Sequence, residues 1–228
     1  MCGRYTLTKV DPAMLRARFG FDVDPALGFD ERPRFNIAPT DPVLAVRETA
    51  DGRREAGRLR WGLLPGAWAR DGSRALINAR AETIEEQAAY RESFLARRCL
   101  IPADGFYEWR HTEHGKQPVW ISRADGEPFA FAGIWAALGE GDGAPVHSCA
   151  IVTCEPNDVV RPIHDRMPVI LEPEVEGTWI ADGQDPAALR ELLRPLGAEA
   201  LEVREVSDAV NDVREDGPHL LEPPLRLF

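Results

Sequence analysis

The chain has 228 residues, enough for one sizeable domain with its own core and too few to expect two. Hydrophobic residues make up 44% and charged residues 29%, and no apolar run approaches the roughly 20 residues of a helix that crosses a bilayer, which excludes a membrane-spanning helix. The net charge of −11 argues against a generally basic nucleic-acid-binding protein, but residues 1–110 carry 18 Arg and Lys against 16 Asp and Glu, which permits a local anion site.

Three short helices are predicted from their start and stop signals. The first covers residues 11–20, where an Asp-Pro start is followed by spaced apolar residues and a Gly stop. The second opens with the capping box Thr83-x-x-Glu86 and runs to about Arg97. The third begins at an Asp-Pro pair and covers residues 185–193.

Short runs of strand character, separated by Pro, Gly and Asp, occur between these helices. They are Val43–Val46, Leu59–Leu63, Cys99–Ile101, Phe106–Trp109, Pro118–Ile121, Phe129–Trp135, Ser148–Thr153, Val169–Leu171 and Leu201–Val206. Strands outnumber helices and do not alternate with them, which disfavours a doubly wound parallel sheet. We expect an α+β fold: a single domain with a curved, largely antiparallel, barrel-like sheet flanked by a few short helices.

The expected domain spans residues 1–206, and the acidic, proline-containing segment 207–228 is expected to be a loosely packed, flexible tail. Cys2, Cys99, Cys149 and Cys154 contain no C-x-x-C pair and match neither a disulfide framework nor a common zinc pattern. We therefore expect no metal and no cofactor. The amino terminus lacks the apolar stretch of a signal peptide, which favours the cytoplasm.

Cys2 is the first residue that suggests chemistry. Removal of Met1 would leave a free α-amine and a thiol on one carbon framework, a pair suited to capturing an aldehyde as a Schiff base and then as a five-membered thiazolidine. An α-amine with a pKa of about 7.7–8.0 is roughly 10–15% neutral at pH 7, against well under 0.1% for a lysine. From Cys2 alone, an incidental second residue explains the sequence as well.

Seven blocks in a fixed order give Cys2 a context. They are M-C-G-R-Y at 1–5, R-F-N-I-A-P-T at 34–40, W-G-L-L-P at 61–65, I-N-A-R-A-E-T at 77–83, R-R-C-L-I-P-A-D-G-F-Y-E-W at 97–109, F-A-G-I-W at 131–135 and H-D-R-M-P-V-I-L at 164–171. This set closely resembles the SOS-response-associated peptidase (SRAP) family, from residue 2 to about residue 171.

The resemblance implies an activity that crosslinks the protein to abasic sites in single-stranded DNA and protects damaged strands at replication forks. It places the nucleophile at Cys2 and an asparagine that holds the N-terminal residue at Asn78. It places an acid/base pair around the opened deoxyribose at Glu108 and His164. From the residues alone, Glu108 could equally be a half-buried ion-pair partner and His164 a core histidine.

The resemblance also implies contacts to the DNA. The matching positions are Arg4, Asn36, Pro39, Trp68, Arg80, Thr153 and Arg166, with Pro39 and Trp68 in loops that support or wedge the bases. Gly66 and Ala67 stand between Pro65 and Trp68, one residue more than in the family's W-G-L-x-P-x-W spacing, which weakens the wedge role of Trp68. The implied partner is single-stranded DNA with abasic sites, bound by a monomer associated with the nucleoid.

Two other functions stay open. The family name suggests a thiol peptidase that uses Cys2, with Glu108 and His164, to process its own amino terminus or another chain. The arginine-rich composition, in which 25 of 27 basic residues are Arg, also allows a non-catalytic binder of single-stranded or modified DNA. The same excess of arginine can reflect a GC-rich genome.

The last five residues, P-L-R-L-F, resemble the bacterial sliding-clamp-binding pattern Q-L-x-L-F with proline in place of glutamine. Leu225, Leu227 and Phe228 would enter apolar pockets of the clamp as an extended segment. The alternative is that these side chains cover the core of their own domain.

Overall fold

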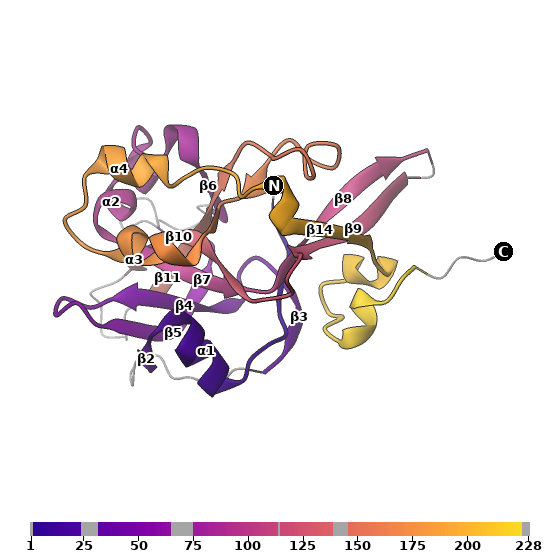
Figure 1. Cartoon of the computed structure of the whole chain (residues 1–228), viewed down its shortest axis with the longest axis horizontal. Helices are drawn as coiled ribbons and strands as arrows, with labels where there is room; N and C mark the ends of the chain where they lie inside the picture. The colour runs from indigo at the N-terminus through magenta and orange to yellow at the C-terminus, as the bar shows by residue number, and fades with distance from the viewer. Residues whose placement is uncertain (1, 24–31, 65–74, 114, 139–145, 225–228) are drawn as a thin grey trace.

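The computed structural model describes residues 2–23, 32–64, 75–113, 115–138 and 146–224. These residues form one α+β domain in which two curved sheets carry a few short helices, which confirms the fold class expected from the sequence (Figure 1). No helix in these ranges is long and apolar enough to span a bilayer.

Five strands close into a barrel. The strands β5 (Arg54–Trp61), β4 (Pro42–Glu48), β7 (Arg98–Ala103), β10 (Phe129–Leu138) and β11 (Val146–Cys154) pair antiparallel in that order, and β11 then pairs parallel with β5. Short strands extend the barrel: β2 (Asp22–Val23) on β5, β6 (Asn78–Arg80) and β12 (Met167–Pro168) on β11, and β13 (Ile170–Leu171) on β10.

The second sheet has five strands in the order β14 (Leu201–Glu205), β9 (Gly115–Arg123), β8 (Gly105–Thr112), β1 (Tyr5–Leu7) and β3 (Arg34–Ile37), all antiparallel. The two sheets meet at Tyr5, whose ring packs edge-on against Trp61 and Phe131 of the barrel with centroids 5.4 and 5.6 Å apart. All three side chains are fully buried. Burial of such large apolar surfaces anchors the first strand of the chain to the barrel.

The first and third predicted helices are confirmed. Helix α1 (Pro12–Phe19) is capped by Asp11, which accepts a hydrogen bond from the Met14 amide, and it ends at Gly20 with a left-handed φ of 65°. Helix α4 (Pro186–Glu191) is capped in the same way by Asp185.

The second predicted helix begins too early. Thr83 ends a 3₁₀ turn (Ala81–Thr83), and its carbonyl and hydroxyl both accept hydrogen bonds from Gln87. Helix α2 therefore spans Ala88–Ala96, and the capping box is not used. Helix α3 (Pro173–Ile180), with no side-chain cap, was not predicted.

The C-terminal segment packs on the second sheet over residues 207–224, which differs from the loose packing expected from its acidic composition. Two 3₁₀ turns, Asp208–Asn211 and Pro218–Leu221, bury Val210 and Leu220 against Tyr107 and Trp120. A third 3₁₀ turn, Ala198–Ala200, precedes β14. The proposed clamp-binding residues Leu225, Leu227 and Phe228 lie outside the described residues.

Candidate functional site

Cys2 lies at the start of the strand that joins the two sheets. Strand β1 pairs with β8 through Tyr5 and Phe106, and the Tyr107 amide donates a hydrogen bond of 3.0 Å to the Arg4 carbonyl. The same antiparallel register brings the residues before Arg4 beside Glu108. The Cys2 side chain has no exposed surface, and its Sγ lies 3.9 Å from the Arg4 carbonyl oxygen.

Asn78 connects Cys2 to the barrel. It begins β6, which pairs parallel with β11 through Ile151. Its Nδ2 donates a hydrogen bond of 2.9 Å to the Cys2 carbonyl, and the Tyr90 hydroxyl donates one of 3.1 Å to the Asn78 carbonyl. The Asn78 Oδ1 atom is buried and has no hydrogen-bond partner among the described residues. The Asn78 side chain is therefore held by its Nδ2, and its Oδ1 can accept a hydrogen bond from another group.

Glu108 approaches Cys2 from the other side. Its side chain is buried, and burial raises its pKa to about 7, with Asp165 acting in the same direction and the charge of the amino terminus opposing them. Burial, and after it the nearby charge of Glu108, also raises the pKa of the Cys2 thiol far above its usual range. At neutral pH the thiol therefore keeps its proton, while Glu108 can both accept and donate one.

His164 is held as a neutral ring. The Arg166 amide donates a hydrogen bond of 3.0 Å to Nδ1, and burial lowers the pKa of the imidazole. Asp165 lies 2.9 Å from the same nitrogen, but this contact is attractive only if Nδ1 carries a proton. The lowered pKa favours the backbone contact, so the proton of the neutral ring is on Nε2.

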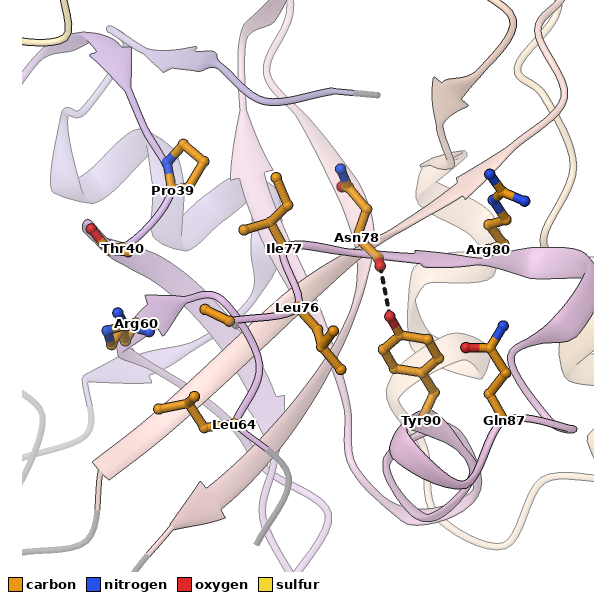
Figure 2. A pocket seen from close by; sticks show the side chains of 11 residues that line it. Pro39, Thr40, Arg60, Leu64, Leu76, Ile77, Asn78, Arg80, Gln87 and Tyr90 are labelled. Carbon is orange, nitrogen blue, oxygen red and sulfur yellow. Dashed lines mark hydrogen bonds between the residues drawn. The ribbon is translucent and has the colours of Figure 1, made fainter. Parts of the chain in front are cut away.

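Two cavities are lined by residues that interact with Cys2. The larger of these, on the Asn78 side, has a volume of about 750 Å³. Figure 2 shows Leu64, Leu76 and Tyr90 along it, with Arg60 at one end and Arg80 at the other. Its rim includes Pro39 and Thr40, and Thr40 has a positive φ of 81°, which is uncommon for a residue other than glycine. The cavity combines an apolar floor with two separated positive charges.

The smaller cavity, of about 430 Å³, lies on the Glu108 side. It is lined by Glu108, Trp109, His111, Lys116, Ile163, His164 and Asn211, so both members of the expected acid/base pair open onto it. Cys2 is linked to both cavities through their lining residues: Asn78 donates a hydrogen bond to its carbonyl, and the charge of Glu108 acts on its thiol. In the described ranges no three His, Cys, Asp or Glu side chains are grouped so that they could hold a metal ion.

The residues expected to contact DNA fall into separate groups. Pro39 and Arg80 line the larger cavity. Arg166 makes a two-pronged ion pair with Glu82, with both distances 2.8 Å, and also donates to the carbonyl of Thr153. The Thr153 side chain is buried.

Two further residues that were expected to contact DNA, Arg4 and Asn36, form hydrogen bonds with the C-terminal segment. One Arg4 nitrogen donates to both Asn36 Oδ1 and the Val210 carbonyl at 2.8 Å. The side-chain Nδ2 of Asn36 donates to the carbonyls of Val210, Asp212 and Glu215. Residues 210–215 are thus held by β3 and by the residue that precedes β1. Trp68 lies outside the described residues.

Several lining residues were not predicted from the sequence. Trp109 is adjacent to Glu108 and could have been inferred from that position. Arg60, Lys116 and Asn211 lie outside the recognised blocks, and only the folded chain brings them to the two cavities.

Comparison with known proteins places this arrangement in context. A family model described as SOS response associated peptidase (SRAP) matches residues 1–213. The chain is 38% identical to the abasic site processing protein YoqW of Bacillus subtilis (97% of this chain, 99% of the relative) and 32% identical to YedK of Escherichia coli, also named an abasic site processing protein (98% and 100%). A crystal structure of a Bacteroides thetaiotaomicron protein superimposes with a TM-score of 0.83 at 26% identity, covering 98% of this chain and 100% of that one.

Proposed function

Because the chain belongs to the SOS response associated peptidase (SRAP) family, we propose that it processes abasic sites in single-stranded DNA by bonding Cys2 covalently to the aldehyde of the opened deoxyribose. The observation that carries the proposal is that Cys2 contacts Asn78, which lines a cavity with two arginines, and interacts with Glu108, which lines a cavity with His164. The names of the bacterial relatives support abasic sites as the substrate.

The first step is the opening of the sugar ring. In the closed form the aldehyde is masked as a hemiacetal, so its hydroxyl proton must leave while the ring oxygen gains one. Glu108, with a pKa of about 7, accepts the first proton and can return it to the ring oxygen, while the Nε2–H of neutral His164 can donate a hydrogen bond to that oxygen. Both groups open onto one cavity, so a single sugar can reach both.

The second step is capture by Cys2, once Met1 has been removed. The neutral α-amine adds to the aldehyde carbon, and loss of water gives a C=N bond. The thiol sulfur then adds to that carbon, its proton passes to the nitrogen, and a five-membered thiazolidine results. Glu108, whose charge acts on the thiol, can carry this proton between the two atoms.

The raised pKa of the Cys2 thiol supports this order of events. A thiol peptidase attacks with a thiolate, which requires a depressed cysteine pKa. Here burial and the charge of Glu108 act in the opposite direction. If the amine attacks first and the protonated thiol adds afterwards, the free protein does not need an ionised cysteine.

The strand on either side of the lesion requires its own binding surface. In the larger cavity the apolar floor can hold a sugar or base, while Arg60 and Arg80 can bind phosphates at its two ends (Figure 2). A single strand can bend into two cavities around one residue more easily than a duplex can, because no paired base has to be unstacked.

Denaturing electrophoresis with an abasic oligonucleotide tests the proposal. Intact mass first establishes that Met1 is absent from the purified chain. The wild-type chain should give a shifted band that survives heating, and Cys2→Ala should give none. Cys2→Ser keeps the amine, so it should form a Schiff base that is trapped only with borohydride. A heat-stable band from Cys2→Ala without borohydride would falsify the assignment of the nucleophile.

A further inference from the structure

We propose that the smaller cavity is also a phosphate site, in which Lys116 and His111 bind a backbone phosphate next to the abasic sugar. This inference rests on the proposed function for its substrate, and on the β8–β9 hairpin for its geometry. It adds a second anchor for the strand, on the side of Cys2 opposite Arg60 and Arg80.

The hairpin places two basic side chains directly opposite each other. His111 of β8 pairs with Lys116 of β9 in the antiparallel ladder, and both side chains line the smaller cavity. Like charges directly opposite in a sheet repel and destabilise it. A bound anion between or beside them removes that cost, so the pairing favours a site for a phosphate.

Neither basic group is neutralised by the protein. Among the described residues, His111 and Lys116 have no ion pair and no side-chain hydrogen bond, and both are exposed. Arg110, their neighbour in the same hairpin, instead pairs with Glu205 at 3.4 Å.

The wall beside them is fixed. Trp109 Nε1 donates a hydrogen bond of 2.8 Å to Asn211 Oδ1, and Asn211 follows Val210, whose carbonyl is bound by Arg4 and Asn36. The tryptophan ring and the asparagine thus form one side of the cavity, with Glu108 and His164 also along it. A sugar that presents its C1′ to Glu108 can extend its own phosphate toward Lys116.

The first measurement is non-covalent binding. A single strand containing tetrahydrofuran in place of the abasic sugar has no aldehyde, so its affinity reports contacts without crosslinking. We expect Lys116→Gln to weaken binding and to reduce the slope of log K against log salt by about 0.7, the value for one phosphate contact on a single strand. His111→Gln should also weaken binding to the same strand.

The matched control is Lys9→Gln. Lys9 is the only other lysine of the chain, and its Nζ donates to the Gly126 carbonyl, outside both cavities. This variant should keep the wild-type affinity and salt slope. Equal effects of Lys9→Gln and Lys116→Gln would show a general charge effect and would overturn the site.

The second measurement locates the phosphate. Strands are made in which a single linkage beside the tetrahydrofuran is an uncharged methylphosphonate, on the 5′ side or on the 3′ side. At the linkage that Lys116 binds, the wild-type chain should lose affinity while Lys116→Gln loses none further. If every methylphosphonate weakens the two proteins equally, Lys116 binds no phosphate there and the inference fails.

These assays also separate the inference from the proposed function. A wild-type chain that never crosslinks an abasic strand, yet shows the Lys116 effect on the tetrahydrofuran strand, keeps the phosphate site and loses the covalent chemistry. Crosslinking without any Lys116 effect at either linkage gives the opposite result.

Discussion

The two cavities beside Cys2 differ in what their walls can do. The larger one has an apolar floor and two arginines at its ends, and its described lining residues include no carboxylate or histidine. The smaller one contains a buried carboxyl whose pKa is raised to about 7, which can exchange protons near neutral pH, and an imidazole whose lowered pKa keeps the ring neutral. Under the proposed function, the larger cavity holds the strand and the smaller one carries the proton-transfer groups next to Cys2.

The difference suggests that binding and chemistry can be altered separately. A change on the titratable side should affect rates and pH dependence, and a change on the arginine side should affect affinity and salt dependence. Two residues are exceptions. Asn78 lines the larger cavity but holds Cys2, and Lys116 lines the smaller cavity but is proposed to bind a phosphate. Four predictions test this division, from the largest expected effect to the smallest.

Glu108→Gln should slow crosslinking by about 10²–10⁴-fold, the usual cost of removing a positioned proton-transfer group. The amide keeps the shape of the side chain but cannot accept the proton of the hemiacetal or of the thiol. Single-turnover kinetics on an abasic strand give the rate, and a tetrahydrofuran strand gives the affinity, which should stay within about twofold. A normal rate with weakened binding would place Glu108 on the strand-holding side.

The same variant should remove a pH dependence of stability. Because the pKa of Glu108 is raised from 4.5 to about 7 in the folded chain, the native state binds more protons than the unfolded state between those values. Wild-type stability therefore falls as pH rises from about 4.5 to 7, by up to about 3 kcal/mol relative to Glu108→Gln. Urea unfolding across this range measures the difference, which Arg80→Ala should not change.

Asn78→Ala should slow crosslinking by up to roughly tenfold, since it removes one hydrogen bond to the Cys2 carbonyl, worth about 0.5–1.5 kcal/mol. Affinity for the tetrahydrofuran strand should change less than the rate. Tyr90→Phe is the matched control, because it loses only the bond to the Asn78 carbonyl and should have a smaller effect. A larger loss from Tyr90→Phe would mean that the backbone at 78, not its amide, positions Cys2.

Arg80→Ala should have the smallest effect, a few-fold loss of affinity with a salt slope reduced by about 0.7. The crosslinking rate at saturating DNA and its pH profile should match those of the wild type. Arg16→Ala removes an exposed arginine from α1, away from both cavities, and serves as the control. A change in the pH profile of Arg80→Ala would contradict the assignment of binding and proton transfer to different cavities.

The sequence predicted local structure best where the signals are short-range. Asp11 and Gly20 delimit α1 as expected, because a cap and a left-handed stop act within one or two turns. The helix start predicted from the capping box at Thr83 was wrong. Gln87 donates hydrogen bonds to the carbonyl and hydroxyl of Thr83, and the chain turns there before α2 begins. Helix α3 was missed because its first turn has proline but no side-chain cap.

The sequence named candidate residues for the site, but it did not predict the cavities around them. The blocks indicate Cys2, Asn78, Glu108 and His164, but the two cavities depend on pairings between distant segments, such as β6 with β11. The packing of the acidic C-terminal segment has the same origin. Its carbonyls are bound by Asn36, more than 170 positions earlier, and no local pattern in residues 207–224 reveals this.

The central position of β1 has a consequence for the timing of biosynthesis. Strand β1 is synthesised before its partners, yet it can enter the sheet only after β3 and β8, at residues 34–37 and 105–112, have been made. In the folded chain Cys2 and Tyr5 are fully buried and Arg4 is bound to Val210, so an aminopeptidase has little extended chain to grip. Trimming of Met1 should therefore occur on the nascent chain, and reactivity toward DNA should appear only when synthesis is nearly complete.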